Sequence, residues 1–352
     1  MNTNPDWWDP YSCQPYKLAS EDKPRLSAQN LWEYAKVFGT ALAVSPVLMM
    51  RYLTLPKPSP PPMRDMAGLS INSDPQWRTP HQEMVQEIGV RNLLIRVPVW
   101  DMQNLEDTLR YMDGFPGCEF TVNILQSRDS VLNPSHWKNQ IGEILNQMSD
   151  RVKVFQIGNA VNRSKWGCRH SGEALKLFEM ASEARQSSGS NAELLMSSVI
   201  DFEPLLTTRT LINCRDYKSD GCAAQLYVNR RGSPEGKQYG FFDLERKLRL
   251  VKSALALSPN TANRLWITET NWPLLDTRPY TPNSGHPRST VDEETQAEYL
   301  TSYFHTARET GWVERVFWWQ LINAGYGLVD HRQGPLRKMP SFYAFKSLFT
   351  ET

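Results

Sequence analysis

After residue 62 the chain alternates between two kinds of hydrophobic pattern. Short runs of β-branched and apolar residues indicate strands, and longer stretches with apolar residues three and four positions apart indicate helices. Eight strands are predicted, at Met66–Asn72, Asn92–Val99, Glu119–Leu125, Lys153–Gly158, Leu194–Val199, Ala223–Val228, Leu265–Thr268 and Val313–Leu321. The helical stretches between them include Gln82–Ile88, Leu105–Met112, Trp137–Met148, Ser171–Ser187, Phe242–Ala256 and Glu293–Thr310. Strands that alternate with helices in this way are typical of a parallel α/β fold.

The number of predicted strands favours one α/β architecture, the (β/α)₈ TIM barrel. Eight strands, each followed by a crossover, close naturally into such a barrel. The competing architecture is an open doubly wound sheet, which usually carries a glycine-rich first turn, and the sequence has none. The chain has 352 residues, of which 40% are hydrophobic, enough for a barrel with an extension. We therefore expect one barrel over residues 63–352.

Residues 1–62 are predicted to form an N-terminal extension. The stretch 56–62 contains five prolines, which predict an extended linker, because proline fits neither a helix interior nor a central strand. Before it, one helical pattern runs from Leu26 to Tyr52. Its apolar part, Val37–Met50, is 14 residues long and contains Pro46, whereas a helix that spans a bilayer needs about 20 residues. Two interpretations stay open, a helix buried against the barrel and a helix at a membrane interface.

Charge and cysteine content exclude several classes of function. The net charge is +1, so nothing in the composition indicates binding to nucleic acid. The five cysteines have irregular spacings without a CxxC pair, which indicates neither a disulfide framework nor a zinc site. The six histidines lack the spacing of metal ligands, and we predict neither metal nor cofactor.

The first ten residues, MNTNPDWWDP, lack a basic segment followed by an apolar one, so no classical signal peptide is predicted. We accordingly expect a cytoplasmic protein. Residues 37–50 would add a peripheral membrane contact if their helix lies at a membrane interface.

Candidate catalytic residues are sought at the carboxyl ends of the predicted strands, where barrel enzymes carry their active sites. The fourth predicted strand runs into Asn159 and Ala160, and the seventh runs into Glu269. Glu269 follows a hydrophobic run between two tryptophans, a poor position for a solvated surface charge. Two roles stay open for it, a structural ion pair with Arg96 and a catalytic nucleophile.

These strand ends resemble those of the clan A glycoside hydrolases, in which an Asn-Glu pair ends strand four and a lone glutamate ends strand seven. The resemblance covers about residues 63–350 and does not include the extension. It is strengthened by segments similar to the clan's seventh helix, eighth strand and closing motif, at Glu294–Glu309, Phe317–Leu321 and Pro340–Phe345.

The resemblance implies a role for each matching residue. Glu269 would be the nucleophile, and Asn159 would hydrogen-bond the 2-hydroxyl of the sugar. Arg96 would keep Glu269 ionised, and Tyr227 would orient it. Either Trp319 or Trp318 would form the floor of the sugar subsite, because neighbouring residues of a strand point to opposite faces. The predicted substrate-binding set is completed by Trp272, Asn271 and Arg163.

The sequence departs from the clan pattern at position 160, where the clan has the glutamate that acts as general acid and base. A methyl group can neither donate nor accept a proton, so Ala160 leaves this position without its chemistry. Two explanations stay open, an engineered replacement and a natural pseudoenzyme. The other matching residues are all in place, and this favours a replacement at one position.

The predicted function is therefore that of a retaining glycoside hydrolase acting on a bacterial-type or other complex glycan, here with an inactive acid/base position. An oligosaccharide or polysaccharide is the expected partner. Cations near the strand ends would suit a carboxylated or phosphorylated glycan, or would simply be solvated: Arg163, Lys165, Arg169, Arg230 and Arg231. Two alternatives are a transglycosylase in cell-surface polysaccharide assembly and a glycan-binding protein without catalysis.

Overall fold

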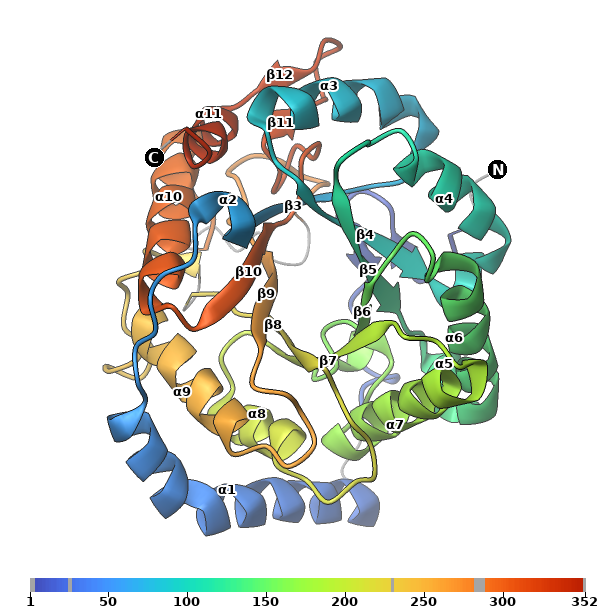
Figure 1. The fold of residues 1–352 in the computed structure, drawn as a ribbon, viewed down its shortest axis with the longest axis vertical. Helices are drawn as coiled ribbons and strands as arrows, with labels where there is room; N and C mark the ends of the chain where they lie inside the picture. Colours follow the sequence, from blue (N-terminus) through green and yellow to red (C-terminus); the bar gives the residue numbers. More distant parts are fainter. Residues whose placement is uncertain (1–3, 25–26, 229–230, 282–288, 351–352) are drawn as a thin grey trace.

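The computed structural model describes residues 4–24, 27–228, 231–281 and 289–350. In this part of the chain, eight parallel strands close into a barrel in the order β10-β3-β4-β5-β6-β7-β8-β9. Figure 1 shows them in the centre, surrounded by helices. The strands are β3 (Ala67–Ile71), β4 (Asn92–Pro98), β5 (Glu119–Leu125), β6 (Val154–Ile157), β7 (Glu193–Ile200), β8 (Gly221–Gln225), β9 (Leu265–Thr270) and β10 (Val313–Trp318). The predicted TIM barrel is confirmed.

Helices cover the outside of the barrel and connect successive strands. They are α2 (Met63–Met66), α3 (Arg78–Ile88), α4 (Leu105–Met112), α5 (Arg128–Leu132), α6 (Pro134–Met148), α7 (Ser171–Ser188), α8 (Pro204–Leu211), α9 (Leu244–Ala256), α10 (Glu293–Thr310) and α11 (Pro340–Ser347). Short 3₁₀ turns lie at η1 (Pro75–Trp77), η2 (Val99–Asn104) and η3 (Ser164–Trp166), and two small hairpins at β1–β2 (Trp8–Asp9, Gln14–Pro15) and β11–β12 (Val329–Asp330, Arg337–Lys338).

Two layers of buried side chains hold the barrel together. The larger layer lies between the strands and the surrounding helices. A smaller cluster of apolar side chains comes from β4 and from the neighbouring strands β7, β8, β9 and β10, and it comprises Leu94, Leu195, Ala223, Trp266 and Phe317. Because inward-facing residues of alternate strands fill the interior in layers, this cluster is a packed core and not a channel.

The predicted N-terminal helix is present as α1 (Ala28–Thr54), which begins where the Ser27 hydroxyl accepts a hydrogen bond from the Asn30 amide at 3.2 Å. Figure 1 shows α1 along the outside of the barrel, against α8 and α9. The linker after α1 is also held on the barrel, because the Trp312 indole donates to the Pro56 carbonyl at 2.8 Å. Gly311 lies so close to this linker that a methyl group there would come within 2.4 Å of the Pro58 carbonyl oxygen.

Candidate active site

Glu269 lies near the carboxyl end of β9, and its side chain is only 12% exposed. Three side chains from neighbouring strands and loops donate hydrogen bonds to its carboxylate. Arg96 from β4 donates to Oε2 at 2.5 Å, Gln225 from β8 donates to Oε2 at 2.8 Å, and the Tyr227 hydroxyl donates to Oε1. These donors hold the buried carboxylate in one orientation.

Tyr227 is a donor that keeps its proton. Burial, together with the negative charge of Glu269, raises the pKa of the Tyr227 phenol well above its usual value. The Arg231 guanidinium lies 4.1 Å from the centroid of the Tyr227 ring and also donates to Asn271 Oδ1 at 2.8 Å. The Asn271 carbonyl oxygen is therefore already hydrogen-bonded to Arg231, next to the contact between Tyr227 and Glu269.

Asn159, just after β6, is fixed by polar side chains from two neighbouring strands. Its Oδ1 accepts hydrogen bonds from Asn123 of β5 at 2.9 Å and from Gln225 of β8 at 2.8 Å. Its backbone amide and carbonyl both bond the Gln126 side chain, each at 2.8 Å. These four bonds place the Asn159 side chain in the same group as Glu269.

Gln225 joins the three central positions of the site. Its Oε1 accepts a hydrogen bond from the Ala160 backbone amide at 2.8 Å, and its Nε2 donates to both Asn159 and Glu269. The side-chain amide of Gln225 therefore contacts both position 160 and Glu269. The sequence pattern did not single out Gln225 or Asn123, although both are polar residues near the carboxyl end of a buried strand, which is the signal that marks them.

Ala160 is fully buried, and its backbone has a positive φ of 43°. Its methyl group packs in one cluster with Trp8, Leu125 and Trp166. Trp8 comes from the N-terminal extension, and its ring centroid lies 5.8 Å from that of Trp166. Ala160 therefore lies in a packed interior, which leaves little room for added atoms.

The N-terminal extension forms one wall of the site, which the sequence did not indicate. The Cys13 carbonyl accepts a hydrogen bond from Arg96 Nη1 at 2.9 Å, and Lys165 Nζ donates to Gln14 Oε1 at 2.6 Å. On the opposite side, Asn323 Nδ2 donates to the Tyr11 carbonyl at 3.2 Å. The β1–β2 hairpin therefore lies across the carboxyl ends of β4, β6 and β10.

Lys165 is a half-buried cation whose charge interacts with that of Glu269. Burial lowers the pKa of its ammonium group to about 8, although the attraction of the Glu269 carboxylate acts in the opposite direction. Lys165 therefore carries its charge at neutral pH and adds to the positive potential around Glu269.

The structure distinguishes between the predicted tryptophans. Trp319 faces the site, with the Arg96 guanidinium 3.5 Å from its ring centroid. Trp318 is fully buried on the other face, where its ring stacks on Trp272 at a centroid distance of 6.0 Å. Trp272 also packs against Tyr303 of α10. The expectation that Trp318 or Trp272 contacts a sugar is therefore corrected, because both rings fill the layer between the barrel and α10.

The predicted cationic residues do not form one group. Arg163 makes ion pairs with Asp201 at 2.6 Å and with Glu203 at 2.5 Å, so its charge is compensated by protein carboxylates. Arg169 is exposed, whereas Arg231 lies beside Tyr227. Arg230 lies outside the described residues.

A cavity of about 610 Å³ lies next to the site, between the N-terminal hairpin and the loops after β4, β5 and β6. Its wall includes the aromatic rings of Trp7, Tyr16, Trp100 and Trp166. Trp166 separates this cavity from Arg96, whose guanidinium carbon lies 5.7 Å from the Trp166 ring centroid. The volume lies within the range of about 300–1,000 Å³ that is usual for ligand pockets.

Among the described residues, no group of three or more His, Cys, Asp or Glu side chains could hold a metal ion. Cysteines at five positions are unbridged, and they are Cys13, Cys118, Cys168, Cys214 and Cys222. The side chains around Glu269 and Asn159 carry carboxylate, amide, phenol, ammonium and guanidinium groups. Such groups bind hydroxyl-rich or anionic ligands by hydrogen bonds.

No family model and no curated protein matches the chain in sequence. Its fold is similar to that of a β-glucosidase from Thermotoga maritima in complex with glucoimidazole, with a TM-score of 0.58 at 12% identity over 83% of this chain and 99% of that one. It is also similar to a GH10 endoxylanase retrieved from a sugarcane soil metagenome, with a TM-score of 0.53 at 13% identity over 81% and 97% of the two chains. A GH128 endo-β-1,3-glucanase from Amycolatopsis mediterranei in complex with laminaritriose gives a TM-score of 0.51 at 15% identity over 81% and 99%. At these identities, the likeness shows that the chain has the barrel fold of these glycoside hydrolases.

Proposed function

We propose that this barrel binds a glycan at Glu269 and carries the nucleophile half of a retaining glycosidase. The observation that supports this most is the set of donors around the Glu269 carboxylate, which come from Arg96, Gln225 and Tyr227. A nucleophile in glycosyl transfer must be an oriented anion, whereas an acid catalyst must hold a proton. The barrel fold shared with glycoside hydrolases is consistent with this role.

The proposed chemistry is a double displacement. One Glu269 oxygen attacks the anomeric carbon and forms a C1–O bond, while the bond from C1 to the leaving oxygen breaks. In a complete retaining enzyme, a second carboxyl group gives its proton to that oxygen and then takes a proton from water. Ala160 performs neither step, so the chain as written can transfer to Glu269 only a sugar whose leaving group departs without a proton.

A second candidate is a glycan-binding protein without turnover, in which Ala160 is the native residue. The observation in its favour is the packing around Ala160, which lies in one buried cluster with Trp8 and Trp166. Under either candidate, the Trp319 ring and the Asn159 amide line the place where the sugar would bind. The two candidates therefore share the binding site and differ only in whether position 160 once carried a carboxylate.

Saccharide binding by the unaltered chain is the first expected result. A glycan array should identify a ligand, and Trp319→Ala should then weaken its affinity by about tenfold, which corresponds to about 1.4 kcal/mol of lost contact. Trp32→Ala is the matched control, because Trp32 is a 64% exposed tryptophan on α1, away from the site. Affinity is measured by isothermal titration calorimetry. Equal losses in the two variants would place the ligand outside the barrel mouth.

A further inference from the structure

The outward side of α1 is an apolar surface that no other part of the described chain covers. Nine of its large hydrophobic side chains are between 47% and 78% exposed. We call this surface the α1 apolar face, and its residues are Leu31, Trp32, Tyr34, Phe38, Leu42, Val47, Met49, Met50 and Leu53. Single exposed apolar residues are common in proteins, whereas a continuous face of this length marks a surface that binds something apolar.

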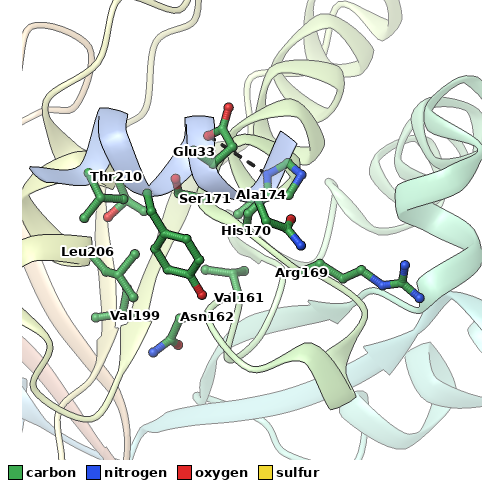
Figure 2. Close-up of a pocket in the computed structure, with 13 residues that line it drawn as sticks. Glu33, Val161, Asn162, Arg169, His170, Ser171, Ala174, Val199, Leu206 and Thr210 are labelled. Carbon is green, nitrogen blue, oxygen red and sulfur yellow. Dashed lines mark ion pairs between the residues drawn. The ribbon is translucent and has the colours of Figure 1, made fainter. Parts of the chain in front are cut away.

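Specific contacts on the inward side fix the direction of this face. Glu33 is 8% exposed, accepts a hydrogen bond from Lys36 at 2.6 Å, and has its carboxylate 4.0 Å from His170 Nδ1. Figure 2 shows Glu33 pointing from α1 toward His170. The carboxylate also lies against the first turn of α7, because a methyl group at Gly172 would come within 2.9 Å of Oε2. A helix N-terminus attracts an anion, so α1 is held with its apolar face outward.

The C-terminal end of α1 is also held against the barrel. Tyr52 is buried, and the Arg249 guanidinium of α9 lies 5.6 Å from its ring centroid. Beyond it, the Arg308 side chain donates to the Pro61 carbonyl at 3.0 Å. The helix is therefore fixed to the barrel near both of its ends, and its exposed face cannot turn inward without breaking these contacts.

By length and composition, α1 could cross a bilayer, because Asn30–Thr54 is 25 residues long and contains an 18-residue window with a mean hydropathy of 1.3. Its flanking segments argue against a crossing. The hairpin before it contacts the barrel through Cys13 and Gln14, and the linker after it contacts the barrel through Pro56 and Pro61. Both flanks therefore lie on the same side of any membrane that α1 contacts.

We propose that the α1 apolar face inserts into the outer part of a lipid bilayer, with α1 lying parallel to the membrane surface. From Leu31 to Leu53 the face is roughly 33 Å long at 1.5 Å per residue. Between Lys36 and Arg51 the helix has no charged residue that would recognise a particular protein surface. Trp32 and Tyr34, at one end of the face, are residue types that favour the membrane–water boundary. This proposal does not depend on the glycan site.

Flotation of the intact chain with lipid vesicles tests the proposal. We expect it to float with phosphatidylcholine vesicles and with vesicles that also contain phosphatidylglycerol, and to bind the two within about threefold, because apolar burial outweighs charge here. The double variant Leu42→Glu/Leu53→Glu should lower the partition coefficient by about tenfold or more, since both side chains would lose their lipid contact. Leu132→Glu on α5 is the matched control, because Leu132 is also exposed, at 63%.

A protease-cleavable tag before residue 1 distinguishes the orientation of α1. The tag should stay fully cleavable from outside the vesicles, whereas a helix that crosses the bilayer would protect it. The proposal is overturned if the intact chain does not float, or if Leu132→Glu weakens flotation as much as the double variant. A concentration-dependent dimer that forms through Leu42 and Leu53 without vesicle binding would also overturn it, and light scattering of the same variants detects that outcome.

Discussion

The double variant Ala160→Glu/Trp8→Ala is expected to turn over the bound glycan about 10²–10⁴-fold faster than the unaltered chain, which is the usual contribution of a general acid. The glutamate supplies the missing proton transfer beside Glu269. Trp8→Ala is added because Trp8 packs in the same buried cluster as Ala160, so that its removal makes room for a longer side chain. Release of reducing sugar from the glycan is the measurement.

Two variants separate proton transfer from a change in packing. Ala160→Gln/Trp8→Ala has nearly the same shape as the active double variant but cannot transfer a proton, so it should stay at the level of the unaltered chain. Ala160→Glu alone should recover less activity than the double variant, because Trp8 still covers the site. Equal rates for the glutamate and glutamine variants would show that position 160 is not the acid/base position.

Arg96→Leu is expected to lower the free energy of unfolding by about 3–5 kcal/mol, because it leaves the Glu269 carboxylate buried without its ion-pair partner. The side chains of this pair are only 10% and 12% exposed, so water cannot replace the lost partner. Urea denaturation monitored by circular dichroism gives the value. Arg96→Leu/Glu269→Gln should recover most of the loss, since it removes the unpaired charge as well.

An exposed ion pair provides the control for this prediction. Arg110 pairs with Glu106 on α4, where the side chains are 62% and 79% exposed. Arg110→Leu should therefore cost at most about 1 kcal/mol. If Arg96→Leu costs no more than Arg110→Leu, Arg96 does not hold Glu269 in the way that its contacts indicate.

The fold could be predicted from the sequence because hydrophobic periodicity is a local signal. The predicted strand Glu119–Leu125 and the predicted helix Glu293–Thr310 have these bounds in the structure. The helix α8 was not predicted, because Pro204–Leu211 contains three threonines, which have low helix propensity. The strand β8 ends at Gln225, three residues before its predicted end at Val228, because Tyr227 already lies outside the sheet.

The site could be predicted only where a residue stands at a strand end in a known pattern. Glu269, Asn159, Arg96 and Tyr227 were named in this way, and the structure brings them together. Gln225 was missed because its role depends on the register between β8 and its neighbours, which the sequence of one strand does not contain.

The contribution of the N-terminal hairpin was missed for a different reason. Trp8 lies about 150 residues before Ala160 in the chain, and no local pattern links the two positions. Trp272, predicted to bind the sugar, instead packs its ring on Trp318. Trp272 lies beyond the end of β9, where the alternation of a strand no longer predicts the direction of a side chain.

The most direct test of the central claim is covalent labelling of Glu269. The unaltered chain is incubated with a panel of 2,4-dinitrophenyl 2-deoxy-2-fluoroglycosides, whose phenolate leaves C1 without a proton, so that Ala160 is no obstacle. Peptide mass spectrometry should then find one fluorosugar bonded to Glu269, and no label in Glu269→Gln. A label on another residue, an equal label in Glu269→Gln, or no label with any fluoroglycoside whose parent sugar the protein binds would contradict the assignment of Glu269 as nucleophile.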